Sequence, residues 1–464
     1  MTDTPIKLLY MILLTGVLFG SCRKFVQVSA PETLLSTGTV FSGDVTALSA
    51  LAGMYSRAMM LQGSFLNGGN TLYPALSADE CVLTLVTPAM QEFSSNALGS
   101  DNNYIFNLYG SAYNILYNTN TLLESLTGSK AVSKPIRRQI VGEALFMRAF
   151  IYSRLVELFG AVPIVTGTNA DVNARMPRSA VDNVYQQVQT DLLAADSLLD
   201  TAYVSFSAGA VERTRPNKWA VRAMSARVHL YRGEWSQAEA AATSVIASGA
   251  YMLEPSLDSV FPKGSREAIW QLQPVSNSIN TAEGAWFIPS SNALARPTYA
   301  LTTYLQKAFQ PGDLRRSRWV GTKTVGGVGY AYPAKYKVRA GTPYREYNMV
   351  IRLAEVYLIR SEARLQQGAL NSAVSDLNVI RHRAGLSALS TSLSKDEILT
   401  ALVQERRIEL FAEWGHRWMD LKRTGLAGTI LPAEKGAWSA NDTLYPIPLT
   451  DIQRNPALMQ NPGY

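Results

Sequence analysis

Two segments of the chain share a pattern that constrains the fold more than any other feature, a helix, a tight turn and a second helix. In each segment a glycine ends the first helix, a large apolar residue stands two positions later, and an alanine stands five positions later. The shared positions are Gly233 and Gly368, Trp235 and Leu370, and Ala238 and Ala373. This arrangement fits the turn of a tetratricopeptide repeat, in which the small alanine lets the second helix approach closely. The chain is therefore expected to be mainly α-helical and built from antiparallel helical pairs.

Apolar periodicity extends this pattern into a degenerate tetratricopeptide-like array. Residues 349–367 carry apolar side chains at helical spacing, with Asn348 as the expected N-cap and Gly368 at the end. A second helix is expected to begin after Asn371 and to stop at Gly385. Further members of the array are predicted at 105–126, 136–159, 179–199 and 394–413.

Two long stretches, 60–104 and 252–345, do not fit the helical array. The first is rich in Gly, Ser, Asn and Thr, and the second combines Gly and Pro with many aromatic residues. Within the second, residues 267–272 alternate enough to predict a short strand. Loops this long inside a folded domain are usually functional. We expect them to form an irregular, loop-rich subregion that holds the ligand site.

The N-terminus has the features of an export signal. Lys7 precedes an apolar run over 8–19, which is shorter than the ~20 residues that a membrane-spanning helix needs. A charged start, a short apolar stretch and small residues before a cleavage site are typical of a signal peptide. We therefore expect a signal peptide at 1–21.

The residue after the predicted cleavage site is a cysteine. Cys22 directly follows Gly20 and Ser21, as in a lipoprotein signal, so we expect Cys22 to be lipidated and 22–464 to form a single domain. An ordinary signal peptide with an incidental cysteine is the alternative. Phe19 supports that alternative, because it stands where a stricter lipidation motif has a small or branched aliphatic residue.

Cysteine, histidine and charge patterns exclude several classes of function. The chain has two cysteines, so if Cys22 is lipidated, Cys81 is unpaired and no disulfide framework is expected. The three histidines lie far apart, and we expect neither a metal site nor a cofactor. A formal net charge of +7 is compatible with nucleic-acid binding. However, the basic residues stand beside acidic ones on predicted helices, as in 405–409, so no nucleic-acid partner is expected.

The C-terminal residues 442–464 carry proline at positions 446, 448, 456 and 462, so they cannot be helical throughout. Apolar and aromatic side chains such as Tyr445, Ile447 and Tyr464 still give the segment a surface to bury. We expect an extended strap packed on the helical body.

This tail and five further segments closely resemble the SusD/RagB family, in the family's order. The five are the pair 142–149 and 158–164, then 352–363, 377–381, 405–410 and 415–423. The resemblance spans essentially the whole mature chain. It implies an α-helical scaffold with four tetratricopeptide-like pairs and an irregular subregion that holds the ligand. It also implies a transporter partner that the protein covers as a lid.

Members of that family are surface lipoproteins of gut-type Gram-negative bacteria that capture nutrients for a TonB-dependent transporter. The resemblance therefore implies a lipid-anchored protein of the outer membrane, facing outward, that captures an oligo- or polysaccharide. It also implies delivery of that glycan to a SusC-like transporter. Peptide is the alternative ligand. A pure adaptor that binds a protein peptide in the repeat groove is disfavoured, because the loops rather than the helices supply the aromatic residues.

Catalysis is the rival class of function. A glycoside hydrolase needs two carboxylates placed across a sugar bond, and Asp79 with Glu80 is the one tempting pair. Adjacent residues on an extended chain point in opposite directions, so they would not form that pair alone. The sequence also lacks a Gly-x-Ser-x-Gly elbow and a phosphate-binding loop. We expect no catalytic residues.

The residues shared with the family near the C-terminus are expected to be structural, forming buried or half-buried ion pairs and packing. They are Arg406, Arg407, Glu409, Arg417, Trp418 and Asp420. Trp235 and Trp270 are likewise expected to pack rather than to bind ligand.

Ligand binding is expected on the two insertions, where aromatic rings can stack on sugar faces and polar groups can bond hydroxyls. Trp286 is the preferred stacking platform. For each candidate, a core aromatic or a surface polar residue is the alternative interpretation. The candidates are Trp286, Phe287, Asn277, Arg296 and Tyr299 in the second insertion, and Asp79, Phe93 and Tyr104 in the first.

Overall fold

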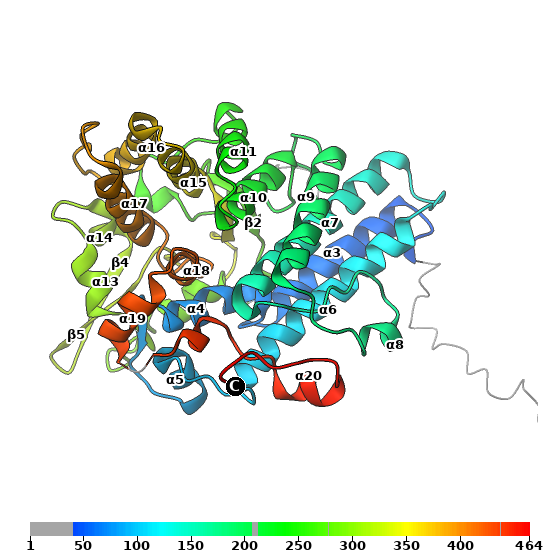
Figure 1. Ribbon diagram of the computed structural model, residues 1–464, viewed down its shortest axis with the longest axis horizontal. Coiled ribbons are helices and arrows are strands. Elements are labelled where there is room, and N and C mark those ends of the chain that lie inside the picture. Colours follow the sequence, from blue (N-terminus) through cyan, green and yellow to red (C-terminus); the bar gives the residue numbers. More distant parts are fainter. Residues whose placement is uncertain (1–39, 207–211, 277, 437) are drawn as a thin grey trace, which may run out of the picture.

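Antiparallel helices form the scaffold in the computed structural model, which describes residues 40–206, 212–276, 278–436 and 438–464 (Figure 1). The scaffold helices are α3 (Asp44–Met60), α6 (Asn103–Leu126), α7 (Lys134–Phe159), α9 (Val181–Leu198), α10 (Lys218–Tyr231), α11 (Trp235–Ala247), α15 (Leu353–Gln366), α16 (Leu370–Arg383) and α17 (Lys395–Glu409). From α6 to α11 each of these helices packs on the next; α11 then packs on α15, which packs on α16 and α17. The prediction of a mainly α-helical fold is confirmed, and the succession of pairs is consistent with a tetratricopeptide-like array.

Both predicted hairpin turns are present. Gly233 (φ +70°) and Gly368 (φ +82°) follow α10 and α15 in the left-handed conformation that glycine adopts most readily. Ala238 and Ala373 are fully buried on the second helix of each pair. The ring of Trp235 lies 3.5 Å from the position that a Cβ atom on Gly233 would take, so Trp235 packs on the turn as expected.

Enlarging Ala238 should therefore disrupt a close helix contact. We expect Ala238→Trp to lower the free energy of unfolding by roughly 1–3 kcal/mol or more, because an extra ring cannot be housed without moving α11. Urea denaturation followed by circular dichroism measures this change. Ala240→Trp, on an exposed position of the same helix, is the matched control. Equal effects of the two substitutions would contradict the close packing of α10 and α11.

Two predicted helix boundaries are wrong. Residues 348–352 form strand β6 (Asn348–Arg352), which pairs antiparallel with β2 (Ala268–Leu272), and the helix begins only at Leu353. The strand is buried along its whole length, and a short apolar run of that kind does not distinguish strand from helix. The helix expected over 394–413 ends at Glu409, because Ala412 and Trp414 adopt positive φ angles. The strand expected over 267–272 is confirmed as β2.

The two insertions are more regular than the sequence predicts, since short helices and strands replace much of the expected loop. In the first lie η2 (Phe65–Gly69), α4 (Asn70–Ser77), β1 (Cys81–Leu83) and α5 (Pro88–Ser95). In the second lie η3 (Leu257–Ser259), β2, α12 (Ala282–Phe287), β3 (Tyr299–Leu301), α13 (Thr303–Ala308), α14 (Leu314–Arg318), β4 (Val320–Val325) and β5 (Val328–Pro333).

The C-terminal tail forms the predicted strap over the helical body, with the short helix α20 (Leu449–Arg454) within it (Figure 1). Tyr445 and Ile447 are fully buried. The Tyr445 ring lies 6.1 Å from the Trp418 ring in a stacked arrangement, and its hydroxyl is 2.9 Å from that of Ser77. The tail therefore connects the first insertion to the C-terminal helices.

The family-like residues near the C-terminus form ion pairs and packing, as predicted. Arg406 pairs with Asp420 at 2.8 Å, Arg417 pairs with Asp79 at 2.7 Å, and Trp418 is fully buried. These contacts join α17, α18 (His416–Arg423) and the first insertion. They serve the structure of the scaffold rather than a solvent-facing site.

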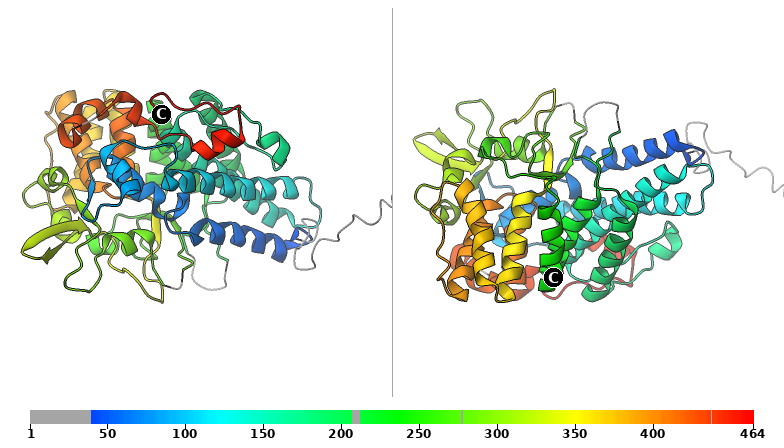
Figure 2. Two further views of the ribbon diagram at one scale, coloured as in Figure 1. Left: turned by 90° about the horizontal axis from the view of Figure 1, so that it is seen from below. Right: turned by 90° about the horizontal axis from the view of Figure 1, so that it is seen from above.

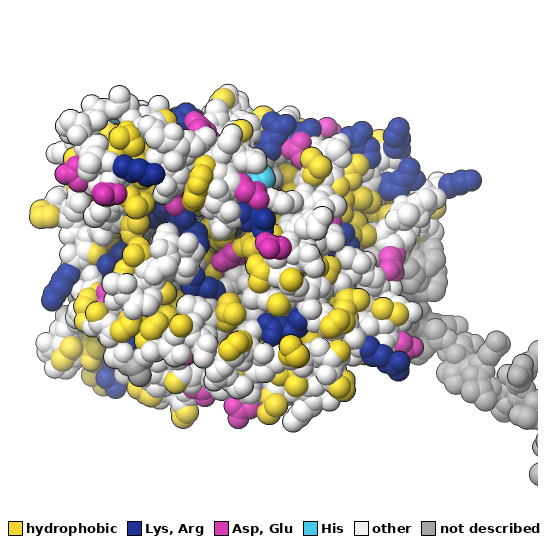
Figure 3. All heavy atoms as spheres, in the orientation of Figure 1, with side chains coloured by type: hydrophobic (Ala, Val, Ile, Leu, Met, Phe, Trp, Pro, Cys, Tyr) yellow, Lys and Arg dark blue, Asp and Glu magenta, His cyan; other side chains and the backbone are white. Residues whose placement is uncertain are grey.

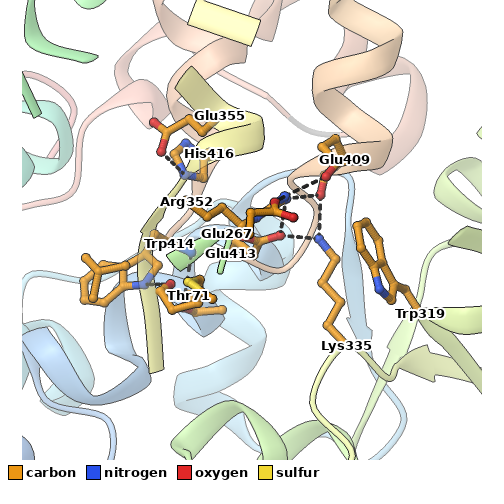
Figure 4. A network of polar contacts seen from close by, with 12 residues as sticks. Thr71, Glu267, Trp319, Lys335, Arg352, Glu355, Glu409, Glu413, Trp414 and His416 are labelled. Atoms are coloured by element: carbon orange, nitrogen blue, oxygen red, sulfur yellow. Dashed lines mark hydrogen bonds and ion pairs between the residues drawn. The ribbon is translucent and has the colours of Figure 1, made fainter. Parts of the chain in front are cut away.

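A buried charge network joins the scaffold to the second insertion (Figure 4). Arg352, at the end of β6, contacts Glu267 at 2.8 Å, Glu409 at 2.6 Å and Glu413 at 2.7 Å. All four side chains are buried. The network holds β2 and β6 against the end of α17 and so fixes the position of the insertion.

Candidate ligand-binding face

The structure brings the two insertions together into one unit, here called the insertion face and formed by the described residues of 60–104 and 278–345 (Figure 2). Strands β1 and β3 pair antiparallel, with Cys81 opposite Leu301. The Thr302 hydroxyl donates to the carbonyl oxygen of Asp79 at 2.6 Å, and the Thr71 hydroxyl donates to Glu283 at 2.9 Å. Segments that lie far apart in the sequence are thus fixed to one another by backbone pairing and buried hydrogen bonds.

Trp286 lies in α12, whose N-cap Thr281 accepts a hydrogen bond from the backbone N–H of Gly284. The indole is half-buried, and one edge rests on the turn formed by η2. A Cβ atom on Gly68 would lie 2.5 Å from Cζ3 of Trp286, and one on Gly63 would lie 3.7 Å from Cη2. Gly68 also has a positive φ of +90°. Both the backbone conformation and the close approach of Trp286 therefore require glycine at this position. The first insertion therefore fixes the position of the Trp286 ring.

Three of the predicted aromatic candidates are core residues. Phe93 is fully buried and stacks on Tyr73 at 4.8 Å between ring centroids. Phe287 and Tyr299 are also buried and contact each other edge to face at 6.2 Å. α5, α12 and β3 turn these three rings inward, so none of them is exposed as a stacking platform. Tyr104 remains half-buried at the start of α6.

Asp79 is a buried anion that is paired inside the protein rather than exposed to solvent. Its carboxylate accepts two hydrogen bonds from Arg417, at 2.7 and 2.8 Å, and pairs with Arg407 at 2.6 Å. Burial would raise the pKa of the Asp79 carboxyl, but these two arginines hold it below its usual value. Burial, together with the Asp79 charge, raises the pKa of Glu80 to about 8. Both carboxyls lie inside the protein, so this pair cannot flank a bound sugar.

The chain after α12 remains accessible. Arg296 is exposed, whereas Asn277 lies outside the described residues. A cation from a neighbouring segment fixes the loop that follows Trp286. Lys323 donates to the carbonyl oxygens of Ser290 at 2.8 Å and of Asn292 at 2.6 Å.

Sequence reasoning missed Lys323 because the hairpin of β4 and β5 was assigned to an irregular loop. These strands pair along their whole length, from Val320 opposite Pro333 to Val325 opposite Val328. The signal was present, since Gly326 and Gly327 form a two-residue turn between alternating segments, which is typical of a hairpin. The hairpin adds a cationic side chain to the insertion face.

A cavity of about 690 Å³ lies among the repeat helices. Figure 3 shows basic and acidic side chains together in a central hollow at this place. Its cationic residues are already paired. Arg417 binds Asp79, and Arg423 contacts Glu362 at 2.5 Å. The cavity therefore offers less uncommitted charge for a peptide carboxylate than its arginines suggest.

Comparison with known proteins gives a consistent result. A family model described as starch-binding and associating with the outer membrane matches residues 77–230, and the model of the SusD family matches 306–464. The chain is 26% identical to SusD-like protein P2 from Formosa agariphila, over 95% of each protein. It is 32% identical to the starch-binding protein SusD from Bacteroides thetaiotaomicron, over 25% of this chain and 21% of that protein.

Solved structures share the fold. A SusD superfamily protein from Bacteroides vulgatus has a TM-score of 0.79 at 21% identity, covering 91% of this chain and 99% of that one. A laminarin-binding SusD-like protein has a TM-score of 0.75 at 24% identity, covering 90% of this chain and 99% of that one. The two family models together match more than half of the chain. The chain therefore belongs to the SusD/RagB family.

Proposed function

We propose that this protein is a cell-surface lipoprotein that captures an oligo- or polysaccharide and delivers it to a TonB-dependent, SusC-like transporter of the outer membrane. The observation that carries this proposal is the match of both halves of the chain to models of one family, described in part as starch-binding and associating with the outer membrane. Relatives named as starch-binding and laminarin-binding proteins support glycan as the ligand class.

The insertion face has the chemistry that a sugar requires. Trp286 offers a fixed, half-buried ring, and pyranose rings present C–H faces that pack on aromatic surfaces. Tyr104 adds a second half-buried ring, and exposed Arg296 adds a hydrogen-bond donor. A few polar groups around an apolar platform are typical of small-molecule sites. We propose that Trp286, Tyr104 and Arg296, together with Asn277, form the glycan site.

We propose capture without turnover, because the tempting carboxylate pair Asp79 and Glu80 is buried and committed to the core. An array of oligosaccharides and peptides, probed with the purified protein, tests the ligand class. We expect saturable binding to one or more oligosaccharides. Binding to peptides alone would contradict glycan capture and would favour the same role in peptide uptake.

We further propose that lipid on Cys22 anchors the protein. In the parts of the chain that the structure describes, no helix is both long and apolar enough to cross a bilayer. Cys22→Ala should yield an unlipidated protein, and we expect it in the soluble fraction or as an uncleaved precursor. One acyl chain binds a membrane only reversibly, so stable attachment requires two or more chains.

Fractionation of cells that lack the transporter measures this effect. Cys81→Ala is the matched control, because Cys81 is buried and should not affect anchoring. Retention of the Cys22→Ala protein in the outer membrane of such cells would show that lipidation is not the anchor.

A further inference from the structure

A separate groove lies between α6, residues 163–174 and α20, and is here called the α6–α20 groove. Its volume is about 380 Å³, within the roughly 300–1,000 Å³ of small-molecule sites. In Figure 1, α6, α8 (Ala170–Asn173) and α20 lie near one another at the lower right. The residues that line this groove belong neither to the insertion face nor to the cavity among the repeat helices.

One wall of the groove is a row of tyrosines. Tyr109, Tyr113 and Tyr117 stand four residues apart and so share one side of α6. Tyr109 is buried, with its ring centroid 4.8 Å from that of Tyr113, whose hydroxyl donates to the carbonyl oxygen of Pro163 at 2.9 Å. Tyr117 is 52% exposed. The two inner rings are thus committed to packing, and the outer ring is available as a platform.

The opposite wall supplies a carboxylate. Asp451 lies in α20, and its Oδ2 atom is buried without a hydrogen-bond partner in the described ranges. The hydroxyl of Tyr109 is buried and interacts with the side chain of Tyr113. Burial raises the pKa of Asp451, and the charge of Arg454 opposes that shift. Because buried polar atoms in native proteins nearly always have partners, the Asp451 carboxylate is left to bond a water molecule or a ligand hydroxyl in the groove.

The chemistry of the walls selects among ligand classes. A cation bound by an aromatic cage needs ring faces that surround it, but Tyr109 and Tyr113 pack on each other, and Arg454 lines the same groove. An anion would face the Asp451 carboxylate. A sugar hydroxyl can donate to a carboxylate, while the sugar ring packs on an aromatic face.

We propose that the α6–α20 groove is a second carbohydrate subsite, in which Tyr117 stacks on a pyranose ring and Asp451 bonds its hydroxyls. This inference rests on the proposed glycan-binding function. The volume suits one or two sugar units. Two subsites on one protein hold a long glycan at two points, so long chains bind more tightly than short ones without new contacts.

Calorimetric titration of the purified protein with maltoheptaose, laminarihexaose, xylohexaose and mannohexaose tests the proposal. For the oligosaccharide that binds most tightly, we expect two sites in the wild type. Tyr117→Ala should weaken the groove site by at least roughly thirtyfold and leave the other site intact. Asp451→Asn should weaken the same site, whereas Tyr117→Phe, which keeps the ring, should retain both sites. Because Tyr117 is exposed, the Tyr117→Ala protein should have the same melting temperature as the wild type.

The outcomes separate the two proposals. A single site that is lost in Trp286→Ala and unchanged in Tyr117→Ala contradicts the groove and leaves glycan capture standing. A site that Trp286→Ala spares and Tyr117→Ala removes supports the groove. Failure of the wild type to bind any of the four oligosaccharides contradicts the proposed function and, with it, the groove.

Discussion

Arg352→Met is expected to lower the free energy of unfolding by about 3–5 kcal/mol, because it removes a buried cation that three buried carboxylates share. The Arg352 guanidinium contacts Glu267, Glu409 and Glu413 inside the protein, at 2.8, 2.6 and 2.7 Å. Methionine keeps much of the volume and removes the charge. Urea denaturation of the purified protein measures the difference.

The remaining cations compensate these carboxylates only in part. Burial would raise the pKa of the Glu409 carboxyl, but Arg383, Arg352 and Arg315 hold it well below its usual range. Lys335 pairs with Glu413 at 2.5 Å, yet burial lowers its pKa to about 8, although Glu413 opposes this shift. Without Arg352, Glu267 and Glu409 keep Arg383 and Glu413 keeps Lys335, but the buried cluster loses one positive charge, so its carboxylates are incompletely compensated.

Arg318→Met is the matched control for this prediction. Arg318 pairs with Asp258 on the surface, at 3.1 Å, and both side chains are substantially exposed. An exposed pair contributes about 0–1 kcal/mol, so this variant should be nearly as stable as the wild type. Arg352→Lys should fall between the two, which keeps the test informative if the methionine variant does not fold. Equal stability of the Arg352 and Arg318 variants would contradict a structural role for the network.

Trp286→Ala is expected to weaken glycan binding by at least about thirtyfold, which corresponds to ~2 kcal/mol. A fixed aromatic ring that is desolvated by a stacked ligand carries a disproportionate share of binding energy. Calorimetric titration with the tightest-binding oligosaccharide of the array measures the loss. Trp286→Phe is the control, because it keeps a ring in the same place and should retain most of the affinity.

The melting temperature must be measured alongside, because Trp286 also packs on Gly63 and Gly68. Weaker binding at an unchanged melting temperature would support the stacking role. Unchanged affinity would show that Trp286 only packs. Of the fallback candidates in the insertions, Phe93 and Tyr299 are buried, so the search would then move to Tyr104.

The scaffold could be predicted because its signals are local. Gly233 and Gly368 end helices by backbone conformation, and Ala238 and Ala373 mark close approach, all within short windows of sequence. The same reasoning wrongly predicted a helix at residues 348–352, because these residues pair with β2, which is distant in the sequence.

The candidate site was harder to predict, because residues distant in the sequence decide whether each side chain is buried or exposed. Asp79 is committed to Arg417, and Phe93 is covered in part by Tyr445 of the tail, 5.6 Å away between ring centroids. No local pattern around Asp79 or Phe93 encodes these contacts. In contrast, the sequence indicates that the two insertions form one subregion, because neither of them fits the helical array.

The central claim is capture of a glycan without its cleavage. Calorimetric titration of the purified protein with the best oligosaccharide of the array, followed by chromatography of the recovered oligosaccharide, tests it most directly. We expect saturable binding and an oligosaccharide of unchanged length after prolonged incubation. Shortened products, or the absence of saturable binding to any oligosaccharide of the array, would contradict it.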